Sequence, residues 1–418
     1  MKILVVGSGA REHAICWKLS KESKVTKIYC APGNAGISQI AECINISVDS
    51  INELVDFAYL NSIDLTVIGP EVPLVAGLAD LLKEKGIKTF GPTKNGARLE
   101  GSKTYSKDFM KKYNIPTAKY ESFTEPERAL KALDRFNEPL VVKADGLAAG
   151  KGVIICSTRK EAQEAIINMM NEKQFGDAGN TVVIEEFLEG TEASLLCFVD
   201  GNNIIPMESA RDYKKAYDND EGLNTGGMGC FSPNTIYTEE LKKYIKQNIL
   251  HKTLKGLNEE GIDFVGVLFI GLMVKNNEAK VLEYNTRFGD PETEVVLPRL
   301  KSSLVDIMLN CINKNLKEED LLWSEESCVT VVLASGGYPE GYEKGKKISG
   351  LSDLDDDVVV FHGGTKFMDD IIVTDGGRVL AVTAMGKTLE EAREKIYKNI
   401  LKINFENMEY RKDIAKVK

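Results

Sequence analysis

The chain has 418 residues, 43% of them hydrophobic, and its 63 acidic and 53 basic residues leave a formal charge of -10 at pH 7. This length and composition predict a globular protein of roughly two to four domains. The negative charge argues against binding to nucleic acid or to an anionic membrane. Because no apolar run approaches the ~20 residues that cross a bilayer and no signal peptide is visible, we expect a cytoplasmic protein without a membrane partner.

Cysteine and histidine usage narrows the chemistry further. The eight cysteines lie mostly in apolar segments and never form a C-x-x-C pair, which favours reduced core cysteines over zinc sites or disulfides. The three histidines, His13, His251 and His362, lie far apart in the sequence. Catalysis centred on histidine is therefore not expected.

The first hundred residues alternate short apolar runs, at 2–6, 25–31, 64–68 and 88–90, with amphipathic stretches. Such βαβ spacing predicts an open parallel sheet in an N-terminal α/β domain over residues 1–102. Each run ends in small or turn-forming residues, and the ligands of parallel sheets gather at that end of the strands. We therefore predict one shared ligand cleft there.

The first of these turns, Gly7-Ser8-Gly9, leads from a strand into a helix whose free N–H groups could hold a phosphate. Glu12 stands where a dinucleotide fingerprint needs its third glycine, and no acidic residue ends the second strand. A nicotinamide site is therefore disfavoured. Phosphate binding and simple tight packing are equal alternatives for this turn.

From residue 103 to residue 323 the pattern becomes α+β, and its strongest local feature is a pair of β-type runs around the glycine-rich loop 146–152. This is not a Walker A loop, because it leads into a strand where a P-loop leads into a helix. A hairpin of this composition can fold over a triphosphate, while Lys143 just before the loop supplies positive charge. An ordinary flexible hairpin is the alternative.

The segment 281–294 carries the sharpest group of polar residues. Strand alternation places Glu283, Asn285 and Arg287 on one face, with Leu282 and Tyr284 on the other. Carboxylate and amide oxygens suit Mg²⁺, and the arginine can neutralise charge on a transferring phosphoryl group. Three such groups facing a core would be costly without a ligand, so a metal and phosphoryl-transfer site is predicted.

Two further segments and the C-terminal part complete the chain. The strand near residue 182 ends in an acidic cluster that could offer an apolar slot for adenine and an acceptor for ribose. The polar, glycine-rich segment 211–229 has no periodicity and predicts a functional loop. Residues 324–418 alternate strands and a final helix at 389–401, which predicts a small C-terminal α+β domain.

Four motifs, at residues 99–103, 143–152, 224–229 and 287–292, together resemble the phosphoribosylamine-glycine ligase family of ATP-grasp enzymes. The resemblance covers the whole chain. It implies an α/β and α+β multidomain protein with an ATP-grasp fold: an N-terminal open parallel α/β domain, an ATP-grasp domain over 103–323 with a mobile lid subdomain at about 120–190, and a small C-terminal α+β domain.

The same resemblance implies a reaction. Glycine would be ligated to 5-phosphoribosylamine with ATP, through glycyl phosphate, to give glycinamide ribonucleotide, ADP and phosphate in de novo purine biosynthesis. The alternative is another ATP-grasp carboxylate-amine ligase with a different acceptor. Glycine's carboxylate is already a nucleophile at neutral pH, so the first step needs alignment more than a protein base. The partners are then small molecules, and a monomer is expected.

The family motifs also imply residue roles. The ATP-binding residues would be Lys103, Lys143, Gly150, Lys151, Gly152, Glu185, Phe187, Leu188 and Glu192. The catalytic residues would be Arg287, Asp212 and Lys143. The substrate-binding residues would be Gly9, Asn34, Glu71, Lys214, Asp290, Pro291 and Glu292. Glu283 and Asn285 would bind Mg²⁺ or Mn²⁺.

Two departures from the family pattern are visible. Tyr213 and Lys215 stand where the family more often has histidine and arginine, which leaves the roles of these two side chains open. ATP-grasp enzymes also carry a carboxylate on the strand before the metal-binding strand, yet Gly271 falls near that place. A second metal would then be bound weakly or by Asp290 or Glu292.

Overall fold

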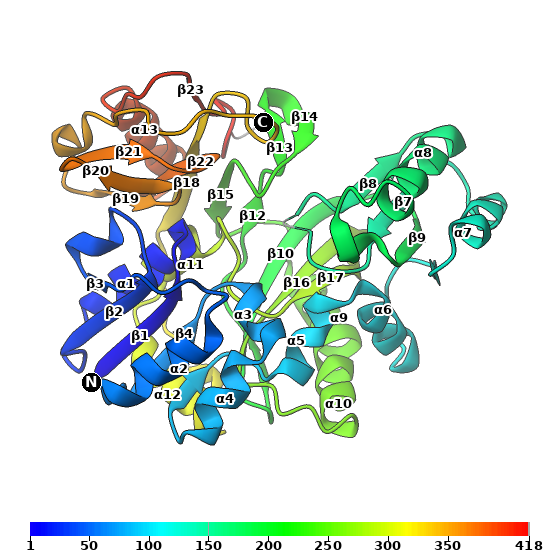
Figure 1. Ribbon diagram of the computed structural model, residues 1–418, viewed down its shortest axis with the longest axis horizontal. Coiled ribbons are helices and arrows are strands. Elements are labelled where there is room, and N and C mark those ends of the chain that lie inside the picture. The colour runs from blue at the N-terminus through cyan, green and yellow to red at the C-terminus, as the bar shows by residue number, and fades with distance from the viewer. Residues whose placement is uncertain (149, 417–418) are drawn as a thin grey trace.

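The computed structural model describes residues 1–148 and 150–416 (Figure 1). Its N-terminal part is an open, fully parallel sheet in the order β3-β2-β1-β4-β5, which confirms the predicted sheet. The elements are β1 (Lys2–Gly7), α1 (Ala10–Ser20), β2 (Lys27–Pro32), β3 (Glu42–Cys43), α2 (Ile51–Leu60), β4 (Leu65–Ile68), α3 (Glu71–Ala76), α4 (Leu78–Glu84), β5 (Lys88–Phe90) and α5 (Lys94–Gly101).

The two faces of this sheet are buried by different helices. Leu4 and Val6 of β1 point into a core formed with α2, α3 and α4. Ile3 and Val5 point to the other face, where α1 packs together with two helices from much later in the chain, α11 (Thr293–Arg299) and α12 (Leu304–Ile312). Burial on both faces explains why β1 reads as an uninterrupted apolar run. The late helices fix this domain to the central part of the chain.

The second region is an antiparallel sheet in the order β6-β9-β7-β8, which stands apart at the right of Figure 1. It has its own hydrophobic core, formed by the sheet and two covering helices. Its strands all fall within 120–190, the segment that the family resemblance assigns to a lid. The elements, with the helix that precedes them, are α6 (Lys103–Lys112), β6 (Tyr120–Phe123), α7 (Pro126–Ala132), β7 (Leu140–Ala144), β8 (Val153–Cys156), α8 (Arg159–Met170) and β9 (Val182–Glu186).

The third region is an antiparallel sheet in the order β11-β10-β16-β17, with one face covered by two helices. The elements are β10 (Thr191–Val199), β11 (Ile204–Pro206), α9 (Glu239–Ile245), α10 (His251–Glu259), β16 (Gly266–Lys275) and β17 (Glu278–Asn285). This sheet and the lid sheet face each other across a cleft.

A β-bulge in β17 corrects one detail of the predicted alternation. Leu272 pairs with Val281 and Gly271 pairs with Glu283, so Leu282 is an extra residue between the two pairs. Val281 and Tyr284 therefore both point into the helix-covered core, whereas Leu282 does not share their face. The predicted separation of Glu283 from Tyr284 still holds, because the bulge lies before both.

The C-terminal sheet, in the order β12-β15-β18-β22-β19 with β23 beside β18, draws two strands from the central region. The segment 211–229, expected to be an irregular loop, in fact contains strands, because β12 pairs with β15, which lies beside β18. Its other two strands, β13 and β14, form a hairpin that turns at Asn219 and Asp220, whose φ angles are 61° and 58°. The elements are β12 (Arg211–Asp212), β13 (Lys215–Tyr217), β14 (Glu221–Asn224), β15 (Gly229–Ser232), β18 (Ser327–Ser335), β19 (Val358–His362), β20 (Thr365–Met368), β21 (Ile371–Thr374), β22 (Arg378–Gly386), α13 (Leu389–Ile400) and β23 (Met408–Glu409).

The N-terminal and C-terminal domains meet through polar and apolar contacts. The ring nitrogen Nδ1 of His13 accepts a hydrogen bond from the backbone N–H of His362 at 2.8 Å. Burial lowers the pKa of His13 to about 3 and that of His362 to about 4, so both rings are neutral and structural. All eight cysteines, each within the described ranges, are free thiols. In the part of the chain that the structure covers, every helix is too short or too polar to cross a bilayer.

Candidate active site

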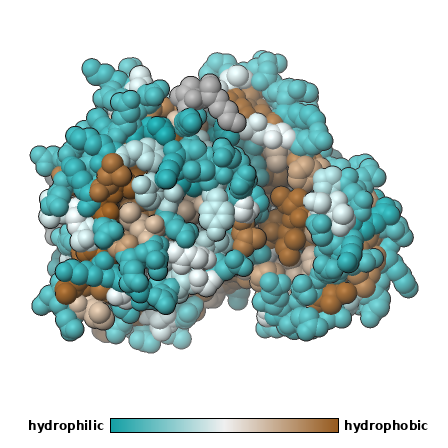
Figure 2. Space-filling model, turned by 90° about the horizontal axis from the view of Figure 1, so that it is seen from above, coloured by the Kyte–Doolittle hydropathy of each residue, from teal (hydrophilic) through white to brown (hydrophobic). Residues whose placement is uncertain are grey.

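A cluster of buried charges lies where the lid sheet meets α6 and the end of β17. Figure 2 shows the hollow that opens between the two lobes of the molecule. Lys143 of β7 places its Nζ 3.0 Å from Oε1 of Glu185 on the neighbouring strand β9, and Lys107 of α6 places its Nζ 2.9 Å from Oε2. All three residues are at most 5% exposed. We call Lys103, Lys107 and Lys143 the lysine cluster, because Lys107 and Lys143 share the carboxylate of Glu185 and Lys103 lies near Lys143.

Burial changes the pKa values of the lysine ammonium groups. Burial lowers the pKa of Lys107 to about 8, although the carboxylate of Glu185 opposes the change. Burial likewise lowers the pKa of Lys103, whose Nζ donates to the carbonyl of Gly146 at 3.2 Å. A bound anion stabilises the charged form of such buried lysines. The cluster is therefore suited to a polyphosphate.

Lys107 was not predicted from the sequence. It lies four residues after Lys103 on α6, so the two side chains share one face of the helix. This four-residue spacing is the sequence feature from which Lys107 could have been predicted. Glu185, expected at the adenine, has its carboxylate committed to the lysine cluster.

The glycine-rich hairpin has the predicted form. Lys143 of β7 pairs with Val153 of β8, and the N–H of Ala144 donates to the carbonyl of Gly152 at 2.8 Å. Gly150 and Lys151 are exposed at the tip, while Ala149 of this motif lies outside the described residues. The Nζ of Lys151 donates to the carbonyl of Pro339 in the C-terminal domain at 3.0 Å. The loop thus reaches across the cleft.

Glu283 and Asn285 lie together at the end of β17, next to the lysine cluster. The Nζ of Lys143 donates to the carbonyl of Leu282 at 3.3 Å. Although burial opposes it, the positive charges of Lys214, Lys143 and other neighbours lower the pKa of Glu283, which keeps it ionised. Among residues 1–148 and 150–416 no cation lies within 4 Å of its carboxylate. Its oxygens are therefore available to a ligand.

These residues fit a divalent cation that is shared with a nucleotide. Within the described ranges, no group of three or more His, Cys, Asp or Glu residues has an arrangement that could hold a metal ion on its own. Mg²⁺ is commonly bound by one or two protein carboxylates together with substrate phosphates, so a full protein cage is not required. Glu283 and Asn285 supply hard oxygen ligands beside the lysine cluster. Gly271, opposite Glu283 in the ladder, brings no carboxylate, as the sequence indicated.

Arg287 lies just beyond β17 and is held by two carboxylates. Its Nε lies 3.2 Å from Oε2 of Glu71, and its Nη2 lies 3.0 Å from Oε1 of Glu100. The Nη2 also lies 3.5 Å from Oδ1 of Asn285. Glu100, which the sequence did not single out, thus joins Glu71 in orienting the arginine. The guanidinium is fixed beside Asn285.

On the other side of Arg287 lies an acid cluster, formed by Asp212, Asp290 and Glu292. The Oε1 of Glu292 accepts a hydrogen bond from the hydroxyl of Ser194 at 2.9 Å. Oδ1 of Asp212 is buried and has no hydrogen-bond partner among the described residues. Burial, together with the negative charge of Glu292, raises the pKa of Asp212. An unpartnered carboxylate of this kind is suited to a cationic ligand group.

Lys214 connects this acid cluster to the metal-binding pair. Its Nζ lies 3.3 Å from Oε2 of Glu192, and carboxylates including Glu192 and Glu283 raise its pKa although burial opposes them. The alternating direction of successive side chains sends Tyr213 the other way, where its hydroxyl accepts from the N–H of Ala415 at 3.1 Å. Lys215 donates to the carbonyl of Gly222 at 3.2 Å. The two departures from the family pattern therefore lie outside the acid cluster.

The N-terminal turn is occupied by the protein's own carboxylate. The N–H of Gly9 donates to Oε2 of Glu12 at 2.6 Å, and Arg11 lies 2.6 Å from Oε1. A Cβ at Gly7 or Gly69 would lie 2.4 Å or 2.1 Å from atoms of the Glu12 side chain, so these glycines make room for it. This arrangement favours tight packing over a phosphate inside the turn.

The remaining predicted substrate residue of this domain is Asn34. Its Nδ2 donates to the carbonyls of Ser8 and His362, each at 2.7 Å. Its Oδ1 accepts from the N–H groups of Gly36 and Ile37, each at 2.9 Å. The side chain therefore connects the N-terminal and C-terminal domains.

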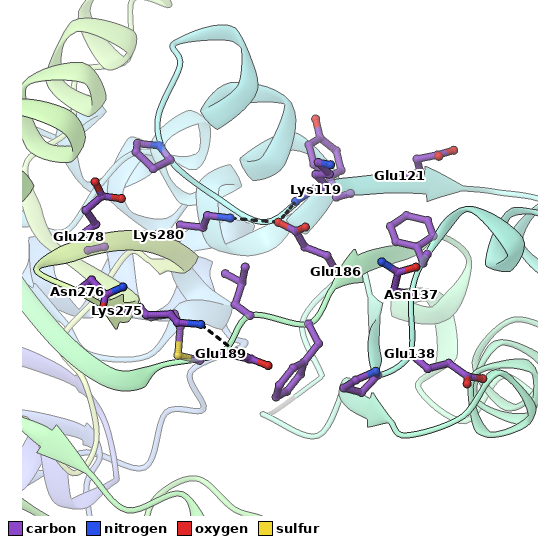
Figure 3. Close-up of a pocket in the computed structure, with 18 of the residues that line it drawn as sticks. Lys119, Glu121, Asn137, Glu138, Glu186, Glu189, Lys275, Asn276, Glu278 and Lys280 are labelled. Atoms are coloured by element: carbon purple, nitrogen blue, oxygen red, sulfur yellow. Dashed lines mark hydrogen bonds and ion pairs between the residues drawn. The ribbon is translucent and has the colours of Figure 1, made fainter.

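A cavity of about 950 Å³ lies where the linker after β9 passes between the two sheets (Figure 3). Phe187 and Leu188 line it, and Phe187 is 36% exposed. The linker is tied to the β16–β17 hairpin, because Lys280 lies 3.2 Å from Glu186 and Lys275 lies 2.9 Å from Glu189. Phe187 and Leu188 are thus separated from Glu185, which points into the lysine cluster.

Comparisons with known proteins agree across the chain. Family models described as the N domain, the ATP-grasp (A) domain and the C domain of phosphoribosylglycinamide synthetase match residues 1–100, 101–293 and 328–417. A phosphoribosylamine-glycine ligase from Clostridium acetobutylicum is 50% identical over 418 residues, with 100% of both chains covered, and one from Fusobacterium nucleatum is 49% identical, covering 99% of this chain and 98% of the other.

Solved structures extend the likeness to the fold. The crystal structure of phosphoribosylamine-glycine ligase from Thermotoga maritima is 37% identical, with a TM-score of 0.87 over 99% of this chain and 100% of the other. The biotin carboxylase domain of 2-oxoglutarate carboxylase from Hydrogenobacter thermophilus, at 17% identity, has a TM-score of 0.76 over 98% of this chain and 91% of the other, and shares the fold alone. The chain belongs to the phosphoribosylamine-glycine ligase family of ATP-grasp ligases.

Proposed function

We propose that this chain ligates glycine to 5-phosphoribosylamine with ATP, forming glycinamide ribonucleotide, ADP and phosphate in purine biosynthesis. The observation that carries the proposal is the adjacency of the lysine cluster and the acid cluster on either side of Glu283, Asn285 and Arg287. The lysines suit the phosphates of ATP, and the acids suit the amino groups of the other two substrates. The full-length relatives at 49–50% identity support the same reaction.

In the first step a carboxylate oxygen of glycine attacks the γ-phosphorus of ATP. The new O–P bond forms as the bond to the ADP oxygen breaks, giving glycyl phosphate. No proton needs to be removed, so the residues act by alignment and charge neutralisation. Lys103, Lys143 and Arg287 neutralise the phosphate oxygens, and Asp212 receives the ammonium of glycine. A divalent cation bound by Glu283 and Asn285, Mg²⁺ or Mn²⁺, screens the negative charge when present.

In the second step the amine of phosphoribosylamine attacks the acyl carbon of glycyl phosphate. The C–N bond forms as the C–O bond to phosphate breaks, and the departing phosphate takes the proton that the amine gives up. Asp290 and Glu292 face this end of the site, with Gly9 and Glu71 on its N-terminal side. An acyl phosphate hydrolyses readily, so the loop that includes Gly150, Lys151 and Gly152 serves by excluding water until the amine attacks.

The nucleotide base and sugar complete the assignment. Phe187 and Leu188 supply apolar contact for adenine at the edge of the cavity beside the linker after β9, and Glu192 accepts from the ribose hydroxyls. Asn34 acts in substrate binding through the turn that it supports. The eight free thiols suit a reducing, cytoplasmic compartment, and a monomer contains every residue used in this scheme.

The test measures ADP formation with freshly generated phosphoribosylamine, omitting each substrate in turn. ADP formation that depends on glycine and phosphoribosylamine together is expected, whereas release with another amine acceptor would favour a different ATP-grasp ligase. Glu283→Gln should lower kcat by about 10²–10³-fold through loss of a charged metal ligand. Glu239→Gln is the control, because that side chain is 90% exposed on α9. Unchanged activity in Glu283→Gln would contradict the metal assignment.

A further inference from the structure

The C-terminal domain contributes two side chains to the edge of the acid cluster that no sequence motif assigned. A cavity of about 270 Å³ lies between this domain and the N-terminal turn. It is lined by Ser8, Gly9 and Ala10 on one side, by Asp290, and by Tyr338 and Arg378 from the C-terminal domain. Its size suits a sugar phosphate better than a nucleotide.

Arg378 joins three parts of the chain at this cavity. Its Nη1 lies 2.9 Å from Oδ1 of Asp290 and donates to the carbonyl of Asp290 at 3.0 Å. The same Nη1 donates to the carbonyl of Gly226 at 2.7 Å. A Cβ at Gly226 would lie 2.8 Å from Cζ of Arg378, so only glycine allows this approach. The arginine therefore holds the loop before β15 against the turn that contains Asp290.

Tyr338 contacts the same loop from the other side. Its hydroxyl accepts a hydrogen bond from the N–H of Gly226 at 3.0 Å. The next residue, Pro339, accepts through its carbonyl from Nζ of Lys151 at the tip of the glycine-rich hairpin, at 3.0 Å. Two consecutive residues of the C-terminal domain thus contact the lid hairpin and the wall of the cavity.

One negative and one positive side chain line the cavity. The carboxylate of Asp290 and the guanidinium of Arg378 both face it, and each is partly exposed, with 17% and 25% of the side chain accessible. A ligand that carries an amine and a phosphate matches such a pair. Phosphoribosylamine has both groups.

From these contacts we infer that Arg378 and Tyr338 are positioning residues for the amine acceptor, and that Tyr338-Pro339 couples occupancy of the acceptor cavity to the position of the lid hairpin. The inference rests on the proposed function. A correctly placed acceptor holds Tyr338, the Pro339 carbonyl holds Lys151, and the hairpin stays over the acyl phosphate. When the acceptor is bound but its contact with Tyr338 is lost, the hairpin is released, and water attacks the acyl carbon to give glycine and phosphate.

The test compares Tyr338→Phe with Tyr342→Phe in the full chain. Tyr342 neighbours Tyr338, with ring centroids 6.2 Å apart, but does not line the cavity. Loss of the single hydrogen bond in Tyr338→Phe should raise the KM for phosphoribosylamine about fivefold and increase the ADP released per ribonucleotide formed, with the KM for ATP unchanged. Tyr342→Phe should match the parent in all three quantities.

A second variant keeps the inference testable if the first has a small effect. Arg378→Lys retains the charge but cannot reach Asp290 and Gly226 together, so the KM for phosphoribosylamine should rise about tenfold. Arg393→Lys is the control, because its guanidinium donates to the carbonyls of Lys412 and Ile414 and lies over the ring of Tyr397, and none of these residues lines the cavity. If the parent forms no ADP with glycine and phosphoribosylamine, the proposed function fails. If the parent is active and both Tyr338→Phe and Arg378→Lys equal their controls, this inference alone fails.

Discussion

Buried cationic groups are in excess at one end of the site, and buried acidic groups are in excess at the other. At one end, Lys107 and Lys143 share the single carboxylate of Glu185, with Lys103 close to Lys143, and burial lowers the pKa of Lys103 and Lys107. At the other end, burial raises the pKa of carboxylates, among them Asp212 and Glu292. Each end lacks charges that the substrates carry. A polyphosphate completes the lysine cluster, and amino groups complete the acid cluster.

This contrast explains how one cleft can order its substrates without histidine. The strand end with Glu283, Asn285 and Arg287 lies between the two clusters, which is where the γ-phosphate must meet the glycine carboxylate. A molecule that enters in the wrong orientation brings like charges together, and this is costly at low dielectric. The residues that orient the substrates are therefore the buried charged groups that lack enough opposite charge from the protein itself.

The largest expected effect comes from removing the charge of Lys143. Lys143→Met keeps the apolar stem but leaves Glu185 with only Lys107 as its partner and removes one contact to the phosphates. We expect kcat/KM to fall about 10²–10³-fold, as for loss of one preorganised donor. Lys160→Met on α8 is the control, since that side chain is 84% exposed. Steady-state kinetics within twofold of the parent would show that the lysine cluster does not bind the transferring phosphate.

The acid cluster gives the next effect. Asp212→Asn removes the carboxylate whose Oδ1 lacks a partner, so the ammonium of glycine loses its counter-charge. The KM for glycine should rise about 10–100-fold, the range for a hydrogen bond to a charged group, while the KM for ATP stays constant. Asp356→Asn, at an exposed position of the C-terminal domain, is the control. A rise in the KM for ATP instead would place Asp212 at the nucleotide end.

The sequence predicted the strongly patterned parts of the site well. The hairpin around Lys143 was expected because two β-type runs flank a loop of small residues, and the strand ending at Asn285 was expected because its polar and apolar residues alternate. The parallel sheet at the N-terminus followed from apolar runs that are buried on both faces. These features depend on near neighbours in the chain, which is the information that a single sequence displays.

What the sequence did not show depends on distant partners. The strands within 211–229 exist because β12 and β15 pair next to β18, about a hundred residues later. Arg378 follows an ordinary glycine turn, and nothing nearby indicates that it contacts Asp290. The bulge at Leu282 is a property of the ladder between β16 and β17, so no single strand reveals it. The assigned ligand roles stay predictions until tested.

Lys107 offers a smaller and pH-dependent test of the positive end. Because the pKa of Lys107 is lowered to about 8, its side chain is positively charged below that pH and neutral above it. The dissociation constant for ATP, measured by equilibrium titration, should therefore rise about 3–10-fold between roughly pH 7.5 and 9. Lys107→Met should bind ATP more weakly at pH 7.5 and lose this dependence. Lys112→Met, 61% exposed on the same helix, should titrate like the parent.

The smallest expected effect concerns Glu294, which lies behind the acid cluster. Glu294 is fully buried, and neither of its carboxylate oxygens has a hydrogen-bond partner among the described residues. Burial and the neighbouring charge of Asp290 raise its pKa well above the usual 4.5, so the folded protein keeps this proton while the unfolded chain loses it. The folded state then binds more protons than the unfolded state above pH 4.5, and its stability must fall as the pH rises.

Glu294→Gln removes this titration and nearly preserves the shape of the protonated acid. The variant should match the parent near pH 4.5 and exceed its free energy of unfolding by about 1 kcal/mol near pH 8, measured by denaturant unfolding at both values. Glu394→Gln, at an exposed position of α13, should show no such divergence. A parent whose stability is independent of pH over this interval would mean that Glu294 is ionised in the folded protein. The acidic end of the site would then carry one further negative charge, that of the Glu294 carboxylate.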